Sequence, residues 1–383
     1  MKVIVAPDSF KGSLTAAEVA EVVSAALEQA VPGCEVCRLP VSDGGEGLVQ
    51  ALAPVLGAVL ASAQVHGPLG GMTSAAYAVK GDLAVIEMAA ASGLELLEPD
   101  ELDVMNADSR GLGELILDAL DRGCREFLIG IGGSATNDAG MGMLHALGWR
   151  FLDASGNVLS PKGASLESVV EIDDSKADAR LQEARFRVAC DVDNPLYGPQ
   201  GAAAVFAPQK GADPRQAEAL DRGLRNFARV VRAKTGADLQ AVPGSGAAGG
   251  VGGALSAFLA APLLPGAHLV LSALGFDALA AGADLVITGE GCLDAQSLHG
   301  KACFAVLEHC RSLAVPAVAL CGIVKDTASL SALGFEKILP VKPGGQSLEE
   351  AMRKDAAQAN IRKAVLGLFG PGGSFRSPSP GEV

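Results

Sequence analysis

Short apolar runs that end in loops rich in glycine and carboxylates recur along this chain. The stretches are VIVAPDSFKGS (3–13), RLPVSDGGEG (38–47), FLIGIGGSATND (127–138), FRVACDVDNP (186–195) and LVITGEGCLD (285–294). Open α/β sheets bind their ligands outside the carboxyl ends of the strands. Glycine lets backbone N–H groups approach an anion, and a carboxylate there can hold a metal or take a proton. We therefore expect these loops to build one composite site for phosphate and a metal.

Strand-like runs alternate with helical patterns. The chain begins with a buried strand over 3–6, a helix over 16–30 opened by a capping box of Thr15 and Glu18, and a strand over 34–39. This alternation predicts an α/β fold with a mainly parallel sheet. Further strands are expected at 83–88, 126–131, 186–190, 284–288, 315–321 and 336–341, and helices at 111–122, 138–147, 216–235, 302–313 and 347–367.

The length of 383 residues allows two or more domains, each with its own core. Short strand-like pieces and turn signals in the middle of the chain predict a second α/β domain, residues 66–282, inserted into a first domain. The first domain would then consist of residues 1–65 and 283–369. The tail, residues 370–383, is rich in Pro, Gly and Ser, and we expect it to be disordered.

Composition excludes several classes of protein. A net charge of −14 argues against a general nucleic-acid binder, which would carry a basic face. No apolar run reaches the roughly 18 residues that span a membrane, and the N-terminus lacks the pattern of a secretory signal. The eight cysteines are scattered, mostly within apolar runs, as in reduced proteins. We expect a cytoplasmic enzyme that binds neither nucleic acid nor membranes.

The loop after the strand at 126–131 is a candidate phosphate site. It opens the expected helix over 138–147, and helix N-termini bind anions through free N–H groups. Gly132, Gly133 and Ser134 would cradle the phosphate, while Asn137 and Asp138 would cap the helix, face the ligand, or both. The alternative is a plain glycine-rich turn with an Asn/Asp cap. The loop is not a Walker A sequence, because the chain contains no G-x-x-x-x-G-K-[ST].

The first two loops carry further candidates. Asp8 and Ser9 could bind substrate or metal, and Lys11 could neutralise phosphate oxygens. Asp43 and Glu46 flank two glycines and suit Mg²⁺, which prefers oxygen ligands. A solvated turn and an ordinary acidic helix N-terminus, respectively, explain these residues nearly as well.

The last two loops add carboxylates and cations. Asp191 and Asp193 would share one side of the strand if it continues past Cys190, and such a pair can divide into a metal ligand and a general base. The alternative is an Asx turn before Pro195. The remaining charged candidates suit phosphoryl transfer, in which positioning and charge neutralisation supply most of the catalysis. They are Glu290, Asp294, Lys301 and Lys210, the last with a solvated surface lysine as its equal alternative.

These residues resemble the bacterial glycerate kinase family, from residue 3 to about 367. The matching motifs, in the family's order, are APDSFKGSLTA (6–16), PVSDGGEG (40–47), IGGSATNDAGMGM (131–143), CDVDNPLYGPQGAA (190–203), FAPQKGA (206–212), ITGEGCLDAQSLHGK (287–301) and PGGQSLEEAM (343–352). The resemblance implies phosphorylation of D-glycerate by ATP with Mg²⁺, with 2-phosphoglycerate as product. It also implies one flavodoxin-like domain and one distinct α/β domain, with the active site in the cleft.

Two positions depart from the family pattern. Cys292 stands where the family usually has a basic residue after TGEG, so phosphate binding would be weaker or would use Lys301. Ala139 replaces a glycine of the usual N-D-G-G, and we expect little effect because alanine tolerates a first helical turn.

We assign provisional roles on this basis. Asp191 is the predicted general base, with Asp193 as its substitute, and Lys11 is also predicted to be catalytic. The predicted metal ligands are Asp43, Glu46, Glu290 and Asp294, and the predicted substrate or phosphate ligands are Asp8, Ser9, Gly132, Gly133, Ser134, Asn137, Lys210 and Lys301. The loops alone also allow a kinase for another small hydroxy acid, or a non-catalytic anion-binding homologue. A homodimer is an option that the sequence leaves open.

Overall fold

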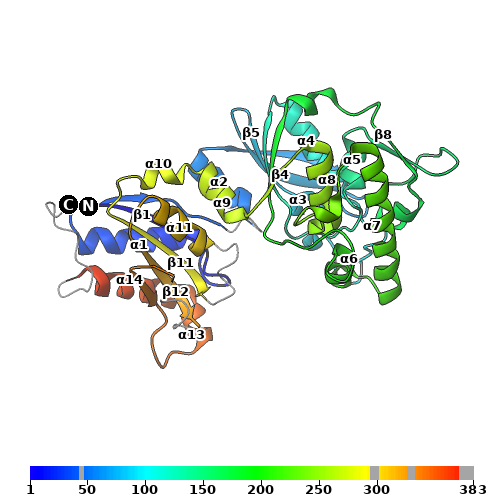
Figure 1. Ribbon diagram of the computed structural model, residues 1–383. Coiled ribbons are helices and arrows are strands. Elements are labelled where there is room, and N and C mark those ends of the chain that lie inside the picture. Colours follow the sequence, from blue (N-terminus) through cyan, green and yellow to red (C-terminus); the bar gives the residue numbers. More distant parts are fainter. Residues whose placement is uncertain (43–46, 294–301, 326–332, 371–383) are drawn as a thin grey trace. The chain divides into compact units, whose positions relative to one another are not determined.

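The computed structural model describes residues 1–42, 47–293, 302–325 and 333–370 (Figure 1). The chain divides into two compact units, one of Met1–Asp43 with Ala267–Val383 and one of Gly44–Gly266. Both units combine helices with a sheet, which confirms the predicted α/β fold. The predicted tail falls outside the described residues from position 371 onward.

The first unit is built around a five-stranded sheet in the order β13-β12-β11-β1-β2. Every neighbouring pair in it is parallel. Counted within the unit, this order is 2-1-3-4-5 read from β2, which is the flavodoxin-like order. The bounds are β1 Lys2–Pro7, α1 Ala16–Ala30, β2 Glu35–Arg38, α9 Gly266–Ala273, α10 Phe276–Ala280, β11 Leu285–Leu293, α11 Ala302–Ser312, β12 Ala317–Val324, β13 Lys337–Pro340, α13 Leu348–Met352 and α14 Lys354–Phe369.

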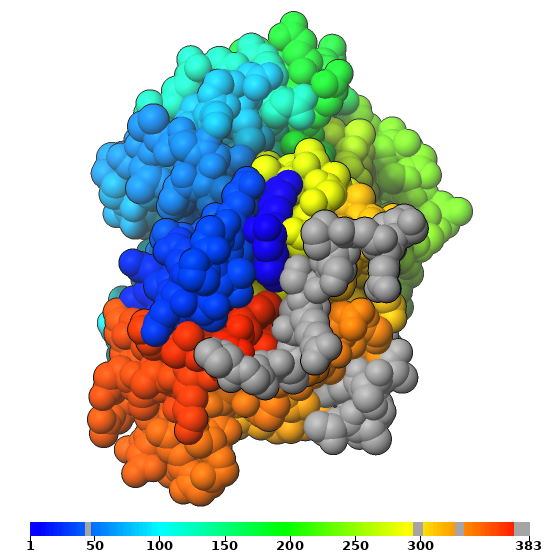
Figure 2. All heavy atoms as spheres, turned by 90° about the vertical axis from the view of Figure 1, so that its left-hand side faces the viewer, coloured from blue at the N-terminus to red at the C-terminus, as the bar shows by residue number. Residues whose placement is uncertain are grey.

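Helices cover both faces of this sheet. Val318 and Leu320 of β12 belong to the core formed with α1 and α14. These two helices lie side by side in Figures 1 and 2. Ala319 and Cys321 alternate with them and pack with Cys303 of α11 on the other face. Because both faces are buried, the strands read as continuous apolar runs.

The second unit contains a six-stranded sheet in the order β10-β9-β6-β5-β4-β3 and a small sheet of β7 with β8. The strands β5, β6, β9 and β10 are parallel neighbours, whereas β3, β4 and β5 pair antiparallel. The bounds are α2 Leu48–Leu56, β3 Val59–His66, β4 Met72–Lys80, β5 Leu83–Glu87, α3 Ala89–Ser92, α4 Arg110–Asp121, β6 Glu126–Gly130, α5 Met141–Ala146, β7 Arg150–Leu152, β8 Glu171–Asp173, β9 Arg185–Ala189, α6 Ala202–Phe206, α7 Pro214–Thr235, α8 Val251–Leu259 and β10 Leu263–Leu264.

The boundaries between the units differ from the predicted breaks at 65/66 and 282/283. The first break lies earlier because β3 pairs along its whole length with β4 and therefore belongs to the inserted sheet. The second break also lies earlier, after Gly266. There, α9 and α10 pack on α11 of the first unit, through contacts of His268 and Phe276 with the ring of His309.

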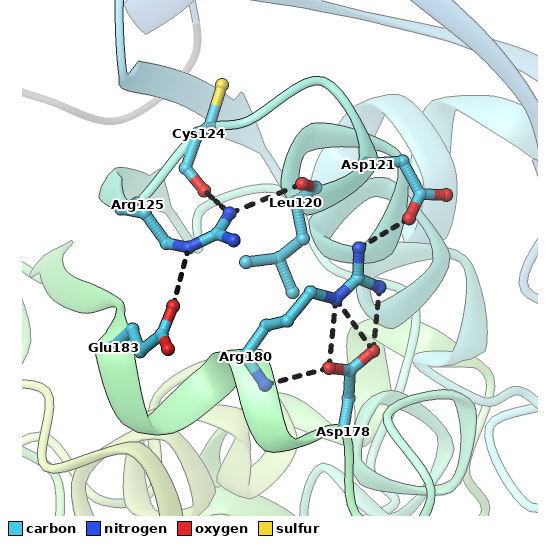
Figure 3. Close-up of polar contacts among 7 residues, drawn as sticks. All are labelled: Leu120, Asp121, Cys124, Arg125, Asp178, Arg180 and Glu183. Atoms are coloured by element: carbon cyan, nitrogen blue, oxygen red, sulfur yellow. Dashed lines mark hydrogen bonds and ion pairs between the residues drawn. The ribbon is translucent and has the colours of Figure 1, made fainter.

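Several ion pairs lie at the amino-terminal edge of the second sheet (Figure 3). Arg180 binds Asp178 through Nη2 at 2.7 Å and Asp121 through Nη1 at 2.6 Å. Arg125, directly before β6, reaches Glu183 at 3.5 Å. The glycine-rich loops of this unit follow the opposite, carboxyl ends of the parallel strands. Within the described part of the chain, no helix is long and apolar enough to cross a membrane.

Candidate active site

A cavity of about 630 Å³ opens at the carboxyl ends of β1, β11, β12 and β13 in the first unit. We call it the first-unit pocket. It lies at the point where the strand order reverses, between β1 and β11, which is where sheets of this type bind ligands. Its lining consists of Asp8, Ser9, Phe10, Lys11, Ser13, Glu290, Gly291, Cys292, Gly322, Ile323, Lys325, Val341, Lys342, Leu348, Ala351, Met352, Ala357 and Asn360.

Asp8 and Glu290 follow neighbouring positions of two paired strands. Pro7 pairs with Gly289 in the parallel ladder, and the N–H of Asp8 donates to the carbonyl of Gly289 at 2.8 Å. Glu290 is only 7% exposed. The pKa of the Cys321 thiol is raised, mainly by burial and secondly by the charge of Glu290. This cysteine therefore stays neutral. The structure thus brings two predicted carboxylates to one edge.

Glycines let the loops of this pocket approach closely. A Cβ on Gly322 would collide with the carbonyl oxygen of Gly291 in the adjacent strand. A Cβ on Gly291 would lie 3.4 Å from the backbone nitrogen of Lys11. The backbone of the TGEG segment therefore packs closely against the loop that carries Asp8 and Lys11.

Three lysines line the pocket, and only Lys11 was predicted. Lys325 and Lys342 follow β12 and β13, and the Nζ of Lys342 donates to the carbonyl of Gln346 at 2.6 Å. Both positions come just after strands that the sequence predicts, so the rule that selected the other loops would have found them. Cys292 also lines the pocket, together with these three lysines.

In the second unit, Asp138 organises the loop 131–140. Its carboxylate, wholly buried, accepts hydrogen bonds from Ser109 N at 2.8 Å and Ser109 Oγ at 2.7 Å, and from the N–H groups of Gly140 and Gly142 at 3.0 Å each. Burial raises the pKa of this carboxyl, and these hydrogen bonds oppose the shift. Asp138 therefore joins the start of α5 to the start of α4.

This arrangement corrects the predicted start of the helix after the glycine-rich loop. The helix begins at Met141 rather than 138, and its first N–H groups are donated to Asp138 instead of a ligand. Asn137 is wholly buried, and neither atom of its amide has a hydrogen-bond partner among the described residues. Gly132 is exposed and Gly133 half-buried, and these two residues are the accessible part of the loop.

Ala139 does not lie in the first helical turn, as the sequence suggested. It precedes the helix and adopts a left-handed conformation with φ of 55°. Its N–H donates to the carbonyl of Gly249 at 2.9 Å. A Cβ on Gly249 would collide with the carbonyl oxygen of Thr136. The small-residue segment around Gly249 thus packs directly on the loop 131–140.

Lys210 is neither a surface lysine nor an accessible cation. It is 3% exposed, and its Nζ donates to Ser134 Oγ at 2.8 Å and to the carbonyl of Thr136 at 2.7 Å. Burial lowers the pKa of Lys210 to about 7, although the charge of Asp138 acts in the opposite direction. Lys210 and Ser134 are thus both engaged in holding the loop.

Asp191 and Asp193 are exposed and lie in a loop, because β9 ends at Ala189 and does not continue past Cys190. A carboxylate oxygen of Asp191 accepts the N–H of Gly266 at 2.8 Å. Since β9 is parallel to β6, this loop and the loop 131–140 leave the same edge of the sheet.

Glu87 is a positioning residue that the sequence reasoning missed. It ends β5, and its carboxylate accepts the N–H groups of Gly47, Leu48 and Val49 at 2.7, 3.1 and 3.1 Å. These groups open α2, directly after the SDGGEG motif. The motif's own carboxylates, Asp43 and Glu46, lie outside the described residues, as do Asp294 and Lys301.

The similarity of this protein to known proteins extends over most of the chain. A sequence model of the glycerate kinase family matches residues 3–368. The chain belongs to the glycerate kinase family. It is 44% identical over 359 residues to a glycerate kinase of Bacillus subtilis, covering 93% of this chain and 94% of that protein. It is 42% identical over 367 residues to the glycerate 2-kinase of Escherichia coli K12, covering 95% and 96%.

A solved structure shows the same architecture. The crystal structure of "putative glycerate kinase 2" from Salmonella typhimurium LT2 superposes with a TM-score of 0.86 at 42% identity, covering 95% of this chain and 96% of that one. The predicted family and enzyme class are confirmed, and the chain is a kinase of the glycerate kinase family.

Proposed function

We propose that this kinase transfers the γ-phosphoryl group of ATP to D-glycerate and gives 2-phospho-D-glycerate and ADP. The observation that carries the proposal is the gathering of Asp8, Lys11 and Glu290 in one pocket of a chain from the glycerate kinase family. The likeness to the Escherichia coli glycerate 2-kinase supports the choice of the 2-position.

The chemistry needs positioning and charge neutralisation more than covalent catalysis. A glycerate oxygen forms a bond to the γ-phosphorus while the bond from that phosphorus to the leaving ADP oxygen breaks. The carboxylate of Asp191 takes the hydroxyl proton in this proposal, and Asp193 is the alternative acceptor. Lys11 would neutralise phosphate oxygens, and the accessible Gly132 and Gly133 of the second unit are proposed contacts for phosphate or the substrate carboxylate.

The residues present fit a magnesium ion. Mg²⁺ is usually held by one or two carboxylates together with substrate phosphates and waters, rather than by a full protein cage. Asp8 and Glu290 line one pocket and supply such oxygens, although the described residues hold no cluster of three or more metal-ligating side chains. Asp43, Glu46 and Asp294 remain proposed ligands. The ion, when bound, would neutralise charge on the transferred phosphoryl group.

A coupled ADP-release assay with D-glycerate and Mg-ATP tests the function, with phosphorus NMR of the product. Release of ADP with a 2-phosphoglycerate signal is the expected result. A 3-phosphoglycerate signal would keep the kinase and overturn the regiochemistry. Release only with lactate, tartronate or hydroxypyruvate would move the substrate to another hydroxy acid.

A further inference from the structure

The lining of the first-unit pocket contains two chemically different groups of side chains. Asp8, Glu290 and the lysines are charged, and a second group, here called the apolar wall, carries no polar atom. The apolar wall consists of Phe10, Ile323, Val341, Leu348, Ala351 and Met352. We propose that this pocket binds the nucleotide, with the purine base on the apolar wall and the phosphates at Lys11 and Lys325. This inference rests on the proposed use of ATP and adds where the nucleotide lies.

The size of the pocket fits a nucleotide better than a small acid. At about 630 Å³, it lies within the range of about 300–1,000 Å³ found for sites that take ligands of drug size. Glycerate is a small acid with polar groups on every carbon and leaves most of that volume unfilled. It also has no surface that an apolar wall would favour.

The charges favour the phosphates. Lys11 and Lys325 are exposed side chains, and within the described part of the chain neither ammonium has an ion-pair partner. Lysine is a point charge that commonly binds phosphate. The pocket thus presents uncommitted positive charge beside an apolar surface, a combination that matches an anion with a large heterocycle.

The apolar wall is exposed where a base would cover it. Leu348 is 51% exposed and Met352 37%, both on α13, whose start is fixed by a capping box of Ser347 and Glu350. A Cβ on Gly12 would lie 2.9 Å from Cε of Met352, so the wall adjoins the loop that carries Lys11. Methionine adapts well to flat ligands because its side chain is flexible and polarizable.

Titration calorimetry with Mg-ADP, together with steady-state kinetics, tests the inference in the full-length protein. Leu348→Glu and Met352→Glu place a carboxylate on the wall at exposed positions that the fold tolerates. Each is expected to weaken Mg-ADP binding by about tenfold or more while the KM for glycerate changes by less than about twofold. The matched control is Leu279→Glu on α10, a leucine 36% exposed and outside the pocket, with unchanged binding.

The phosphate end is tested separately with Lys325→Gln. It should weaken Mg-ADP binding more than adenosine binding, because adenosine lacks phosphates. Unchanged Mg-ADP binding in both wall variants, or a raised KM for glycerate alone, would overturn the inference, as would a wild-type protein that does not bind Mg-ADP. Failure of the proposed function is distinct: the wild type would then bind Mg-ADP, and the wall variants would lose it, without turnover of D-glycerate.

Discussion

Nζ of Lys210 donates a hydrogen bond to Oγ of Ser134 at 2.8 Å inside the second unit. The two residues are 76 positions apart in the sequence. Among the described residues, the second acceptor of this Nζ is the carbonyl of Thr136. Two acceptors match the two N–H groups of a neutral amine, in agreement with a pKa that burial lowers to about 7.

Lys210→Met tests this state through the pH dependence of stability. The pKa is about 7 in the folded protein, against an ordinary value of 10.5. Between these values the unfolded chain binds a proton that the folded protein does not, so the free energy of unfolding rises with pH by up to about 1.4 kcal/mol per unit. Below about pH 7 both states bind the proton, so the free energy of unfolding no longer changes with pH through this group and the full cost of burying the charge remains. We expect the variant to show a smaller rise between about pH 7.5 and about pH 9.5 in urea unfolding.

Lys234→Met is the matched control, because Lys234 is partly exposed and pairs with Asp174 at 2.9 Å on the surface. Its curve should keep the wild-type slope over the same interval. Equal slopes for wild type and Lys210→Met would show that Lys210 is protonated in the folded protein at neutral pH and above.

Glu87→Gln should destabilise the second unit by about 1.5–3 kcal/mol, because it removes a charged acceptor from three backbone N–H groups and from the N-terminus of α2. Urea unfolding measures this loss. Turnover should fall as well, since Gly47 is the last residue of the SDGGEG motif.

Glu183→Gln gives the comparison for Glu87. Its side chain is 72% exposed and pairs with Arg125 at 3.5 Å (Figure 3). We expect less than about 0.5 kcal/mol of destabilisation, as for other surface pairs. If both variants lose the same stability, the Glu87 carboxylate does not anchor α2.

Two alanines in left-handed conformations allow strain and burial to be separated. Ala314 follows α11 with φ of 55° and is exposed, so Ala314→Gly should stabilise the protein by about 0.5–1 kcal/mol. Ala139 has the same φ but is 1% exposed, so relief of strain is offset by the loss of about 0.8 kcal/mol of methyl burial. Ala139→Gly should therefore change stability little. Thermal unfolding distinguishes the two, and destabilisation by Ala314→Gly would contradict the backbone assignment.

The sequence predicted a helix or strand correctly where residues within that element determine its bounds. The helix expected over 16–30 is α1, Ala16–Ala30, because the capping box of Thr15 and Glu18 sets its start. The helix expected over 347–367 is instead two, α13 and α14, since Arg353 adopts an extended conformation without a glycine or proline to announce it. The hairpin of β3 and β4 was also missed, because its stability depends on cross-strand pairing rather than on a strong apolar run.

The residues of the candidate site were likewise predicted where the local pattern was sufficient. Asp8, Ser9, Lys11 and Glu290 were found together because each lies at the carboxyl end of a predicted strand. The role of Glu87 and the link from Asp138 to Ser109 could not be read from the sequence, because these partners come from distant segments. Whether a carboxylate faces solvent or holds a backbone is decided by tertiary packing, which the spacing of residues does not contain.

Asp191→Asn tests the proposed general base with the local structure preserved. The asparagine side chain keeps an oxygen that can accept the N–H of Gly266, so the hydrogen bond at 2.8 Å need not be lost. Removing the basic carboxylate should lower kcat for glycerate phosphorylation by about 100-fold or more, with unchanged unfolding in urea. Asp174→Asn, at an exposed aspartate of the same unit, serves as the control and should retain wild-type turnover.

Asp193→Asn decides between the two neighbours. If Asp193→Asn loses turnover and Asp191→Asn does not, the base is Asp193. Near-normal turnover in both variants would remove the loop after β9 from proton transfer. Steady-state rates at saturating Mg-ATP and D-glycerate separate these outcomes, because only a base acting in the chemical step lowers kcat itself when binding is saturated.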